Sequence, residues 1–396
     1  EKLTILASTA ATGGVSLLGL AAFGGREEIV KFLINVFEDR SSLQFELQKK
    51  LSEGFTPLWL AAVKGHLSIV ELILDCFDTP EERYSCLCQR ATSISKTSID
   101  YAASEGNSDV IGYLLNQLDP RQRLGLLLQE DGYDRNPLML ATINGNASCI
   151  HALLDPLTPQ EQAMYLKAAN SSRSTPLLGA IQKAKTVSID ALLLHCTPDF
   201  TPADYIRSPI DEDCHTALHY AAEQPDKESL SVLLAHLSAE EDSLISCLEA
   251  RSRLGYAALH SACRSKDGGP AALELLNTMH SLGLDTGSRT VFGETPLHLA
   301  AREGLSEVVQ WYMTHAPQQF ELRSHYGSTA CELALMYRQD SLLSLLQEKG
   351  VIPQSEDPRL DPLYGAAPVA IGQTLLIDRL IRYLKASGWL TEDLLK

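Results

Sequence analysis

The chain has 396 residues, of which 45% are hydrophobic and 21% are charged, so it can bury a long core and disorder is not expected over most of its length. Its 50 acidic residues outnumber 33 basic ones, and the formal charge of −17 disfavours binding to nucleic acid and to anionic membranes. This balance fits a basic or neutral protein partner, or serves only solubility.

One seven-residue pattern recurs along the chain and is clearest as T-P-L-H-L-A-A from Thr295 to Ala301. Near-complete copies begin at Thr56 and Thr216. Weaker copies begin at Ser16, Thr97, Asn136, Thr175, Ala257, Thr329 and Asp361. Thr, Ser, Asn or Asp at the first position predicts a helix N-cap, and Pro at the second suits the first helical turn. Leu at the third position is expected in a core, and the Ala pair lets a neighbouring helix approach closely.

The residues after each copy predict two further helices. A glycine at Gly65, Gly106, Gly145 and Gly304 ends the first helix. Apolar residues at helical spacing then predict a second helix. Up to Thr295 the copies start about 40 residues apart, and the extra length carries an S/T-x-x-D/E or related capping-box signature that predicts a short third helix in most units. These segments begin at Thr79, Asp119, Thr158, Thr201 and Ser238.

A helix, a tight turn, an antiparallel helix and a loop in each unit resemble the ankyrin repeat, whose standard length is about 33 residues. The resemblance covers roughly residues 15–350 and, with the copy at Asp361, reaches 367. It implies an all-α ankyrin-repeat solenoid of about nine extended units within residues 1–350, curved around a concave groove. The extended units resemble those of ankyrin effectors that intracellular bacteria deliver into host cells. An ordinary eukaryotic scaffold protein is the alternative.

The C-terminal part, residues 351–396, is expected to form a degenerate tenth unit and capping helices. An amphipathic pattern predicts one of these helices over 371–387, and a partner-binding or membrane helix is the alternative reading. A further helix starts at Thr391 and is expected to continue beyond Lys396.

No catalytic motif stands out in the chain, so we expect no enzyme, no cofactor and no bound zinc or calcium. Cys86 and Cys88 form a C-x-C pair without a second pair at zinc spacing. The neighbours His195-Cys196 and Cys214-His215 are poor candidates for a dyad, because catalytic partners are seldom adjacent in sequence. The acidic run from Asp211 to Asp213 is expected to be a charged patch on a hairpin tip.

Histidines recur at the fourth position of the pattern, as His219, His260 and His298. The ankyrin resemblance implies that these side chains make structural hydrogen bonds to neighbouring loops. The nine cysteines are scattered, and several lie in apolar segments, which predicts buried thiols in a reducing compartment.

The resemblance also implies where a partner would bind, namely at the loop tips before each motif and at exposed positions of the first helix. The candidate partner-binding residues are Phe55, Tyr133, Arg135, His215, Arg253, Tyr256, Arg264, Phe292, Arg302, His325 and Tyr326. Aromatic residues and Arg dominate interface hot spots. The stretch from Tyr256 to Tyr326 is the densest, and it is the predicted centre of binding. The alternative is that some of these rings only pack on the adjacent loop.

The resulting prediction is a monomeric protein–protein interaction module that binds a protein partner through its concave face. It is expected in the cytoplasm, either of its own cell or of a host cell into which it is secreted. The rival is a substrate-binding arm of an enzyme whose catalytic domain lies outside this chain. A third possibility is that the C-terminal helices associate with membrane.

Overall fold

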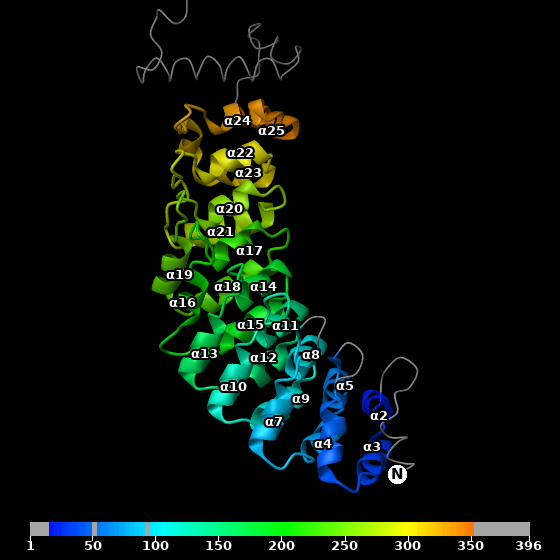
Figure 1. The fold of residues 1–396 in the computed structure, drawn as a ribbon. Helices are drawn as coiled ribbons and strands as arrows, with labels where there is room; N and C mark the ends of the chain where they lie inside the picture. The colour runs from blue at the N-terminus through cyan, green and yellow to red at the C-terminus, as the bar shows by residue number, and fades with distance from the viewer. Residues whose placement is uncertain (1–15, 50–53, 92–94, 352–396) are drawn as a thin grey trace, which may run out of the picture. The chain divides into compact units, whose positions relative to one another are not determined.

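The computed structural model describes residues 16–49, 54–91 and 95–351, and every named element within these ranges is a helix (Figure 1). The predicted all-α class is therefore confirmed. The tenth copy from Asp361 and the capping helices predicted from residue 371 onward lie outside the described residues.

The first helix of each unit begins where the motif predicts. All nine motif copies inside the described ranges supply the N-cap residue of a helix. These helices are α2 (Leu17–Phe23), α5 (Pro57–Lys64), α8 (Ser98–Glu105), α11 (Pro137–Asn144), α14 (Pro176–Gln182), α17 (Ala217–Glu223), α20 (Ala258–Arg264), α22 (Pro296–Glu303) and α24 (Ala330–Met336). In α5, for example, the Thr56 hydroxyl accepts a 3.2 Å hydrogen bond from the backbone N–H of Trp59.

The predicted glycine turn follows the first helix. Gly65, Gly106 and Gly145 end their helices with φ values of 72°, 92° and 84°, a left-handed conformation that glycine adopts without steric cost. The turn leads to a second helix. The second helices are α3 (Glu27–Asn35), α6 (Leu67–Leu74), α9 (Ser108–Asn116), α12 (Ala147–Leu154), α15 (Thr186–Leu194), α18 (Glu228–Leu237), α21 (Gly269–Ser281), α23 (Ser306–His315) and α25 (Asp340–Glu348).

A short third helix is present in the first six units. These helices are α4 (Arg40–Gln48), α7 (Pro80–Leu87), α10 (Pro120–Leu127), α13 (Pro159–Leu166), α16 (Pro202–Arg207) and α19 (Glu241–Leu248). Capping boxes form as predicted at Thr79, Asp119, Thr158 and Thr201. Units seven and eight differ, because α21 is longer and the short 3₁₀ helix η2 (Pro317–Glu321) follows α23.

The capping box predicted at Ser238 is wrong. Ser238 is the C-cap of α18, with helical φ and ψ of −66° and −12°, whereas Glu240 precedes α19 in an extended conformation. The reason is burial at the end of α18. Leu234 and Leu237 are both buried, so the core holds the helix as far as Ser238 and prevents the extended backbone that an N-cap requires.

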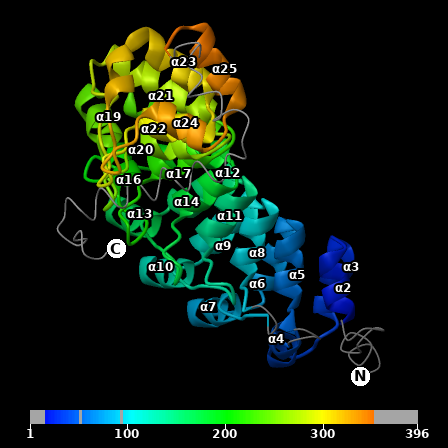
Figure 2. The same cartoon turned by 90° about the horizontal axis from the view of Figure 1, so that it is seen from above.

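The described helices belong to two compact units. The N-terminal unit runs to Ile210 and includes residues 235–237, and the C-terminal unit comprises the rest from Asp211. In the N-terminal unit α2, α5, α8, α11 and α14 pack in sequence order, as do α3, α6, α9, α12 and α15. The third helices α4, α7, α10 and α13 follow one another in a row along this unit (Figures 1 and 2).

The C-terminal unit repeats this arrangement with two rows of its own. Its first helices α17, α20, α22 and α24 pack in order, and so do its second helices α21, α23 and α25. The alanine pair of the motif is buried in α17 and α22, as at Ala300 and Ala301, and one buried alanine remains at this position in α20 and α24. Each first helix therefore occupies a fixed place, and the loop that precedes it is held at the same edge of the unit.

Candidate functional site

The loops that precede α17, α20, α22 and α24 are closed by their own hydrogen bonds. In three of them a backbone N–H donates to the carbonyl four residues on, from Ser252 to Tyr256 at 2.8 Å, from Thr290 to Glu294 at 2.9 Å and from Ser324 to Ser328 at 2.9 Å. The first residue of each loop also accepts a backbone N–H through its side-chain oxygen. These residues are Asp211, Ser252, Thr290 and Ser324. The loops are thus small rigid turns.

Successive loops are joined by one backbone hydrogen bond each. The N–H of Arg253 donates to the carbonyl of Asp213 at 2.7 Å, and the N–H of Val291 donates to that of Leu254 at 3.0 Å. The N–H of His325 donates to the carbonyl of Phe292 at 2.9 Å. Four loops far apart in sequence therefore form one continuous ladder along the C-terminal unit.

The exposure of each predicted loop residue in the structure depends on its position relative to the motif. The residue three places before it stands at the tip, where Tyr326 is 65% exposed and Tyr133 is 63% exposed. The residue directly before it turns toward the first helix. Tyr256 is only 8% exposed there, and Phe55 is half-buried on Trp59 with ring centroids 4.1 Å apart. At Tyr256 the closing hydrogen bond of the loop accounts for this difference, because it folds the last loop residue back against the helix.

Tyr256 is therefore not the exposed contact residue that its loop position predicted. Its ring lies against His260, with centroids 5.9 Å apart, and the Arg264 guanidinium lies 5.3 Å from the ring centroid. Its carbonyl oxygen accepts a 2.8 Å hydrogen bond from His219. These contacts make Tyr256 part of the packing between α17 and α20.

Five of the predicted residues of the C-terminal unit, each at least partly exposed, form a set that we call the tip surface. They are Arg253, Arg264, Phe292, His325 and Tyr326. Phe292 and Tyr326 come from neighbouring loops and stack, with ring centroids 6.5 Å apart and ring planes 18° from parallel. An aromatic pair fixed on a rigid loop ladder offers a large contact area at little cost in side-chain entropy.

Arg302 is more enclosed than its sequence position predicted. Its guanidinium pairs with Glu294 at 3.6 Å and with Glu303 at 3.0 Å. Arg264 is more exposed, and it pairs with Glu223 at 2.7 Å. Exposed pairs of this kind add little to stability, so the Arg264 pair can open to a partner at small cost.

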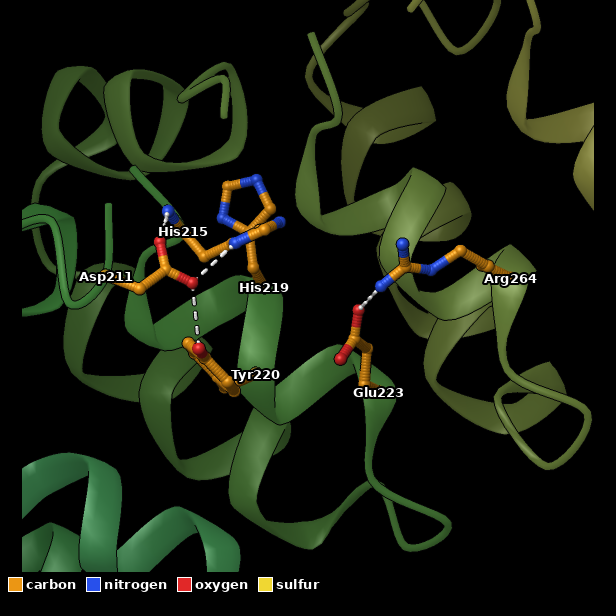
Figure 3. A pocket seen from close by; sticks show the side chains of 6 residues that line it. All are labelled: Asp211, His215, His219, Tyr220, Glu223 and Arg264. Atoms are coloured by element: carbon orange, nitrogen blue, oxygen red, sulfur yellow. Dashed lines mark hydrogen bonds and ion pairs between the residues drawn. The ribbon is translucent and has the colours of Figure 1, made fainter. Parts of the chain in front are cut away.

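A cavity of about 130 Å³ lies between α17 and α20. It is lined by Asp211, His215, His219, Tyr220, Glu223 and Arg264, which Figure 3 shows in two groups. On one side the Asp211 carboxylate contacts His215 Nδ1 at 2.7 Å and accepts a 2.9 Å hydrogen bond from the Tyr220 hydroxyl. On the other side Glu223 pairs with Arg264 (Figure 3).

The electrostatics of this cavity favour an ionised Asp211. Burial opposes ionisation, but hydrogen bonds from His215 and Tyr220 outweigh it and hold the pKa of Asp211 below its ordinary value. Burial and the neighbouring carboxylate raise the pKa of Tyr220 to about 12. The wall holds two carboxylates, of which Asp211 contacts His215 and Glu223 pairs with Arg264, and their negative charge suits a basic side chain.

Sequence reasoning treated Asp211 only as one member of a charged patch and did not identify Tyr220 or Glu223. A periodic signal for Asp211 was nevertheless present. Among the described residues, the fifth residue before the motif carries a side-chain oxygen in six units, at Asp131, Asn170, Asp211, Ser252, Thr290 and Ser324. Glu212 and Asp213 are exposed at the tip, as expected for a charged patch.

In the N-terminal unit the predicted residues form separate contacts. Trp59, on which Phe55 stacks, meets Tyr101 edge-on at 4.3 Å. The Arg135 guanidinium lies 4.8 Å from the Tyr133 ring centroid and pairs at 2.9 Å with the buried carboxylate of Asp131. Of these residues, Tyr133 has the side chain that is exposed and available to a partner.

The two neighbouring Cys/His pairs are not arranged as dyads. His215 faces Asp211, and His195 Nε2 lies 2.8 Å from His151 Nδ1. Burial raises the pKa of the Cys196 thiol to about 12, which disfavours the nucleophilic thiolate.

The fold does bring one set of possible metal ligands together. His151, Asp155 and His195 offer ligand atoms that all lie within 4.8 Å of one another. The sequence does not predict this set, because these residues show no metal-site spacing along the chain. They meet only because α12 and α15 pack side by side.

Comparison with protein families agrees with this architecture. A family model of ankyrin repeats, in three copies, matches residues 18–123 and 259–357, which together are more than half of the chain. Ankyrin repeats are non-catalytic modules that generally mediate protein–protein interaction. In the part of the chain that the structure describes, no helix is long and apolar enough to cross a membrane.

Proposed function

Because the chain belongs to the ankyrin-repeat family, we propose that it binds a protein partner through the tip surface of its C-terminal unit and the cavity beside it. The observation that carries this proposal is the stacked pair of a partly exposed Phe292 and an exposed Tyr326, whose backbone the loop ladder holds in place. A preformed aromatic contact loses little entropy on binding.

The chemistry of the cavity indicates the kind of partner. Asp211 and Glu223 line it against one guanidinium, that of Arg264, and Glu212 and Asp213 are exposed on the neighbouring loop tip. A lysine or arginine side chain of a partner can pair with Asp211 while an apolar residue packs on Phe292 and Tyr326. We therefore propose a partner segment that combines a basic and an apolar side chain. The formal charge of −17 would favour its association.

The test begins with affinity capture of partners by the full chain, followed by binding measurements on the variants Tyr326→Ala, Phe292→Ala and Asp211→Asn. Tyr326→Ala is expected to weaken binding by on the order of tenfold or more, as for a hot-spot aromatic residue. Gln310→Ala is the control, because Gln310 is exposed on the second helix α23 of the same unit, outside the loop tips and the first helices. It should bind within about twofold of wild type.

The tip-surface proposal fails if all three variants fold normally and bind like wild type. The side of the chain that carries the third helices would then be the next surface to examine. Tyr256→Ala is not a suitable probe, because its ring is buried and its loss would disturb packing.

We further propose that the partner is a host protein and that the chain acts as an effector in host cytoplasm. The extended units, with a third helix in the first six, support this proposal by their resemblance to bacterial effectors. Capture from eukaryotic lysate should yield a partner whose binding is lost with Tyr326→Ala. Capture of such a partner from bacterial lysate alone would contradict the effector role.

The alternative is that the same surface holds the substrate of a catalytic domain outside this chain. In that case Tyr326→Ala in the full gene product would reduce turnover of the captured protein. A captured protein that is left chemically unchanged would favour simple recognition.

A further inference from the structure

Three side chains with metal-binding atoms meet where α12 and α15 end. His151 lies in the last turn of α12, Asp155 is the C-cap residue of α12, and His195 is the C-cap residue of α15. His151 Nδ1 lies 2.8 Å from His195 Nε2, and His195 Nε2 lies 3.7 Å from Asp155 Oδ1. The three residues come from two successive units of the N-terminal part.

The spacing of these atoms suits a small tetrahedral ion. Zinc binds imidazole nitrogen and carboxylate oxygen at about 2.0–2.2 Å, which places neighbouring ligand atoms roughly 3.3 Å apart. The observed separations of 2.8 and 3.7 Å lie on either side of that value. Small rotations of the side chains would bring all three atoms to bonding distance.

The surroundings also favour a cation. The three residues lie at the C-terminal ends of two helices, and helix C-termini carry partial negative charge. Asp155 has a side chain that is 67% exposed, which leaves room for a water molecule as the fourth ligand.

We propose that His151, Asp155 and His195 form a binding site for a zinc ion or a similar divalent transition metal. Two imidazoles and one carboxylate are ligands that zinc accepts, whereas calcium and magnesium prefer oxygen alone. The bound ion links the second helices of the fourth and fifth units. It stabilises that junction because it binds the folded arrangement and not the separated helices.

The experiment uses the metal-free full chain, titrated with zinc and, in parallel, with cobalt, whose visible spectrum reports its ligands. Zinc should bind at one ion per chain and raise the melting temperature. His151→Gln and Asp155→Asn should each weaken that binding by on the order of tenfold or more. Because Asp155 is exposed, its variant should fold normally, which circular dichroism can verify.

His236→Gln is the matched control. His236 pairs with Asp190 at 2.8 Å, a similar imidazole–carboxylate contact in the same compact unit. This variant should bind zinc like wild type.

Three results would overturn the proposal. The first is no stoichiometric binding, in which case the two imidazoles only hydrogen-bond to one another. The second is binding that survives in both ligand variants, or that gives a thiolate–cobalt charge-transfer band from the cysteines. The third is an equal loss of binding in the His236 control.

Discussion

The Nε2 atom of His298 on α22 lies 3.0 Å from the carbonyl oxygen of Ser328 in the next loop. At the other side of the ring, Nδ1 accepts a hydrogen bond from the backbone N–H of Thr295 at 3.2 Å. One imidazole thus connects the start of its own helix to the following unit. His219 and His260 make the same pair of contacts, with Tyr256 and Ser288 as the distant partners, which confirms the structural role implied by the family resemblance.

The buried histidines should make stability depend on pH. Burial lowers the pKa of His260 to about 3, whereas an unfolded histidine titrates near 6.5. The unfolded state therefore binds more protons than the folded state between these pH values. The contribution of His260 to the free energy of unfolding is at its full value above pH 6.5, and it falls as the pH drops toward 3. We expect a loss of about 1 kcal/mol per pH unit for this residue between pH 6 and 5.

Denaturant unfolding at several pH values can measure this dependence. His260→Gln should be less stable than wild type at pH 7 but should lose less stability on acidification. His325→Gln, at an exposed loop tip, should follow the wild-type slope. Parallel pH profiles for wild type and His260→Gln would show that His260 does not contribute.

Asp100 should have the opposite pH dependence. Burial raises the pKa of its carboxyl to about 6, although hydrogen bonds from Thr97 oppose the shift. Between about pH 4 and 6 the folded state therefore holds a proton on Asp100 that the unfolded state has released. The contribution of Asp100 to the free energy of unfolding is lost as the pH rises through that window. Asp100→Asn should increase the free energy of unfolding at pH 7.5 by about 1–3 kcal/mol.

The gain from Asp100→Asn should shrink toward zero near pH 4, where the wild-type carboxyl is protonated. Equilibrium unfolding of the two proteins at pH 4.5 and 7.5 can measure the difference. An equal gain at both pH values would mean that packing or hydrogen bonding, and not charge, is responsible.

Leu297 is fully buried on α22, and its replacement by Ala should leave a cavity. Large-to-small changes of this kind cost about 2–5 kcal/mol of unfolding free energy. Leu254→Ala is the matched control, because this leucine is exposed at a loop tip, and it should cost less than about 0.5 kcal/mol. A near-zero change in the denaturant midpoint for Leu297→Ala would contradict the assigned core.

Two turns between first and second helices carry a side chain where other units have glycine. Ala184 and Arg338 have φ values of 51° and 57°, in the left-handed region that costs a non-glycine residue about 1 kcal/mol. Ala184→Gly and Arg338→Gly should each stabilise the chain by roughly 0.5–1 kcal/mol. The reverse change, Gly145→Ala at φ 84°, should destabilise it. Melting temperatures that move in the same direction for all three variants would refute the conformational argument.

Local structure could be predicted from the sequence because its signals act over a few residues. A capping side chain such as Thr56 and a terminal glycine such as Gly65 satisfy or redirect the backbone beside them, whatever lies further away. The starts of nine first helices and four capping boxes followed from such signals. Ser238 did not, because burial of Leu234 and Leu237 outweighed its capping preference.

Whether a predicted residue is exposed, and what it meets, was decided only by the tertiary structure. Tyr256 and Tyr326 both lie in loops before a motif, yet one is buried by the closing hydrogen bond of its loop and the other stands at the tip. His151 and His195 are far apart in sequence and lie 2.8 Å apart in the fold. Short-range signals cannot encode such contacts, because they depend on how successive units stack. The sequence by itself therefore determined the repeated helices, whereas their packing created the tip surface and the proposed metal site.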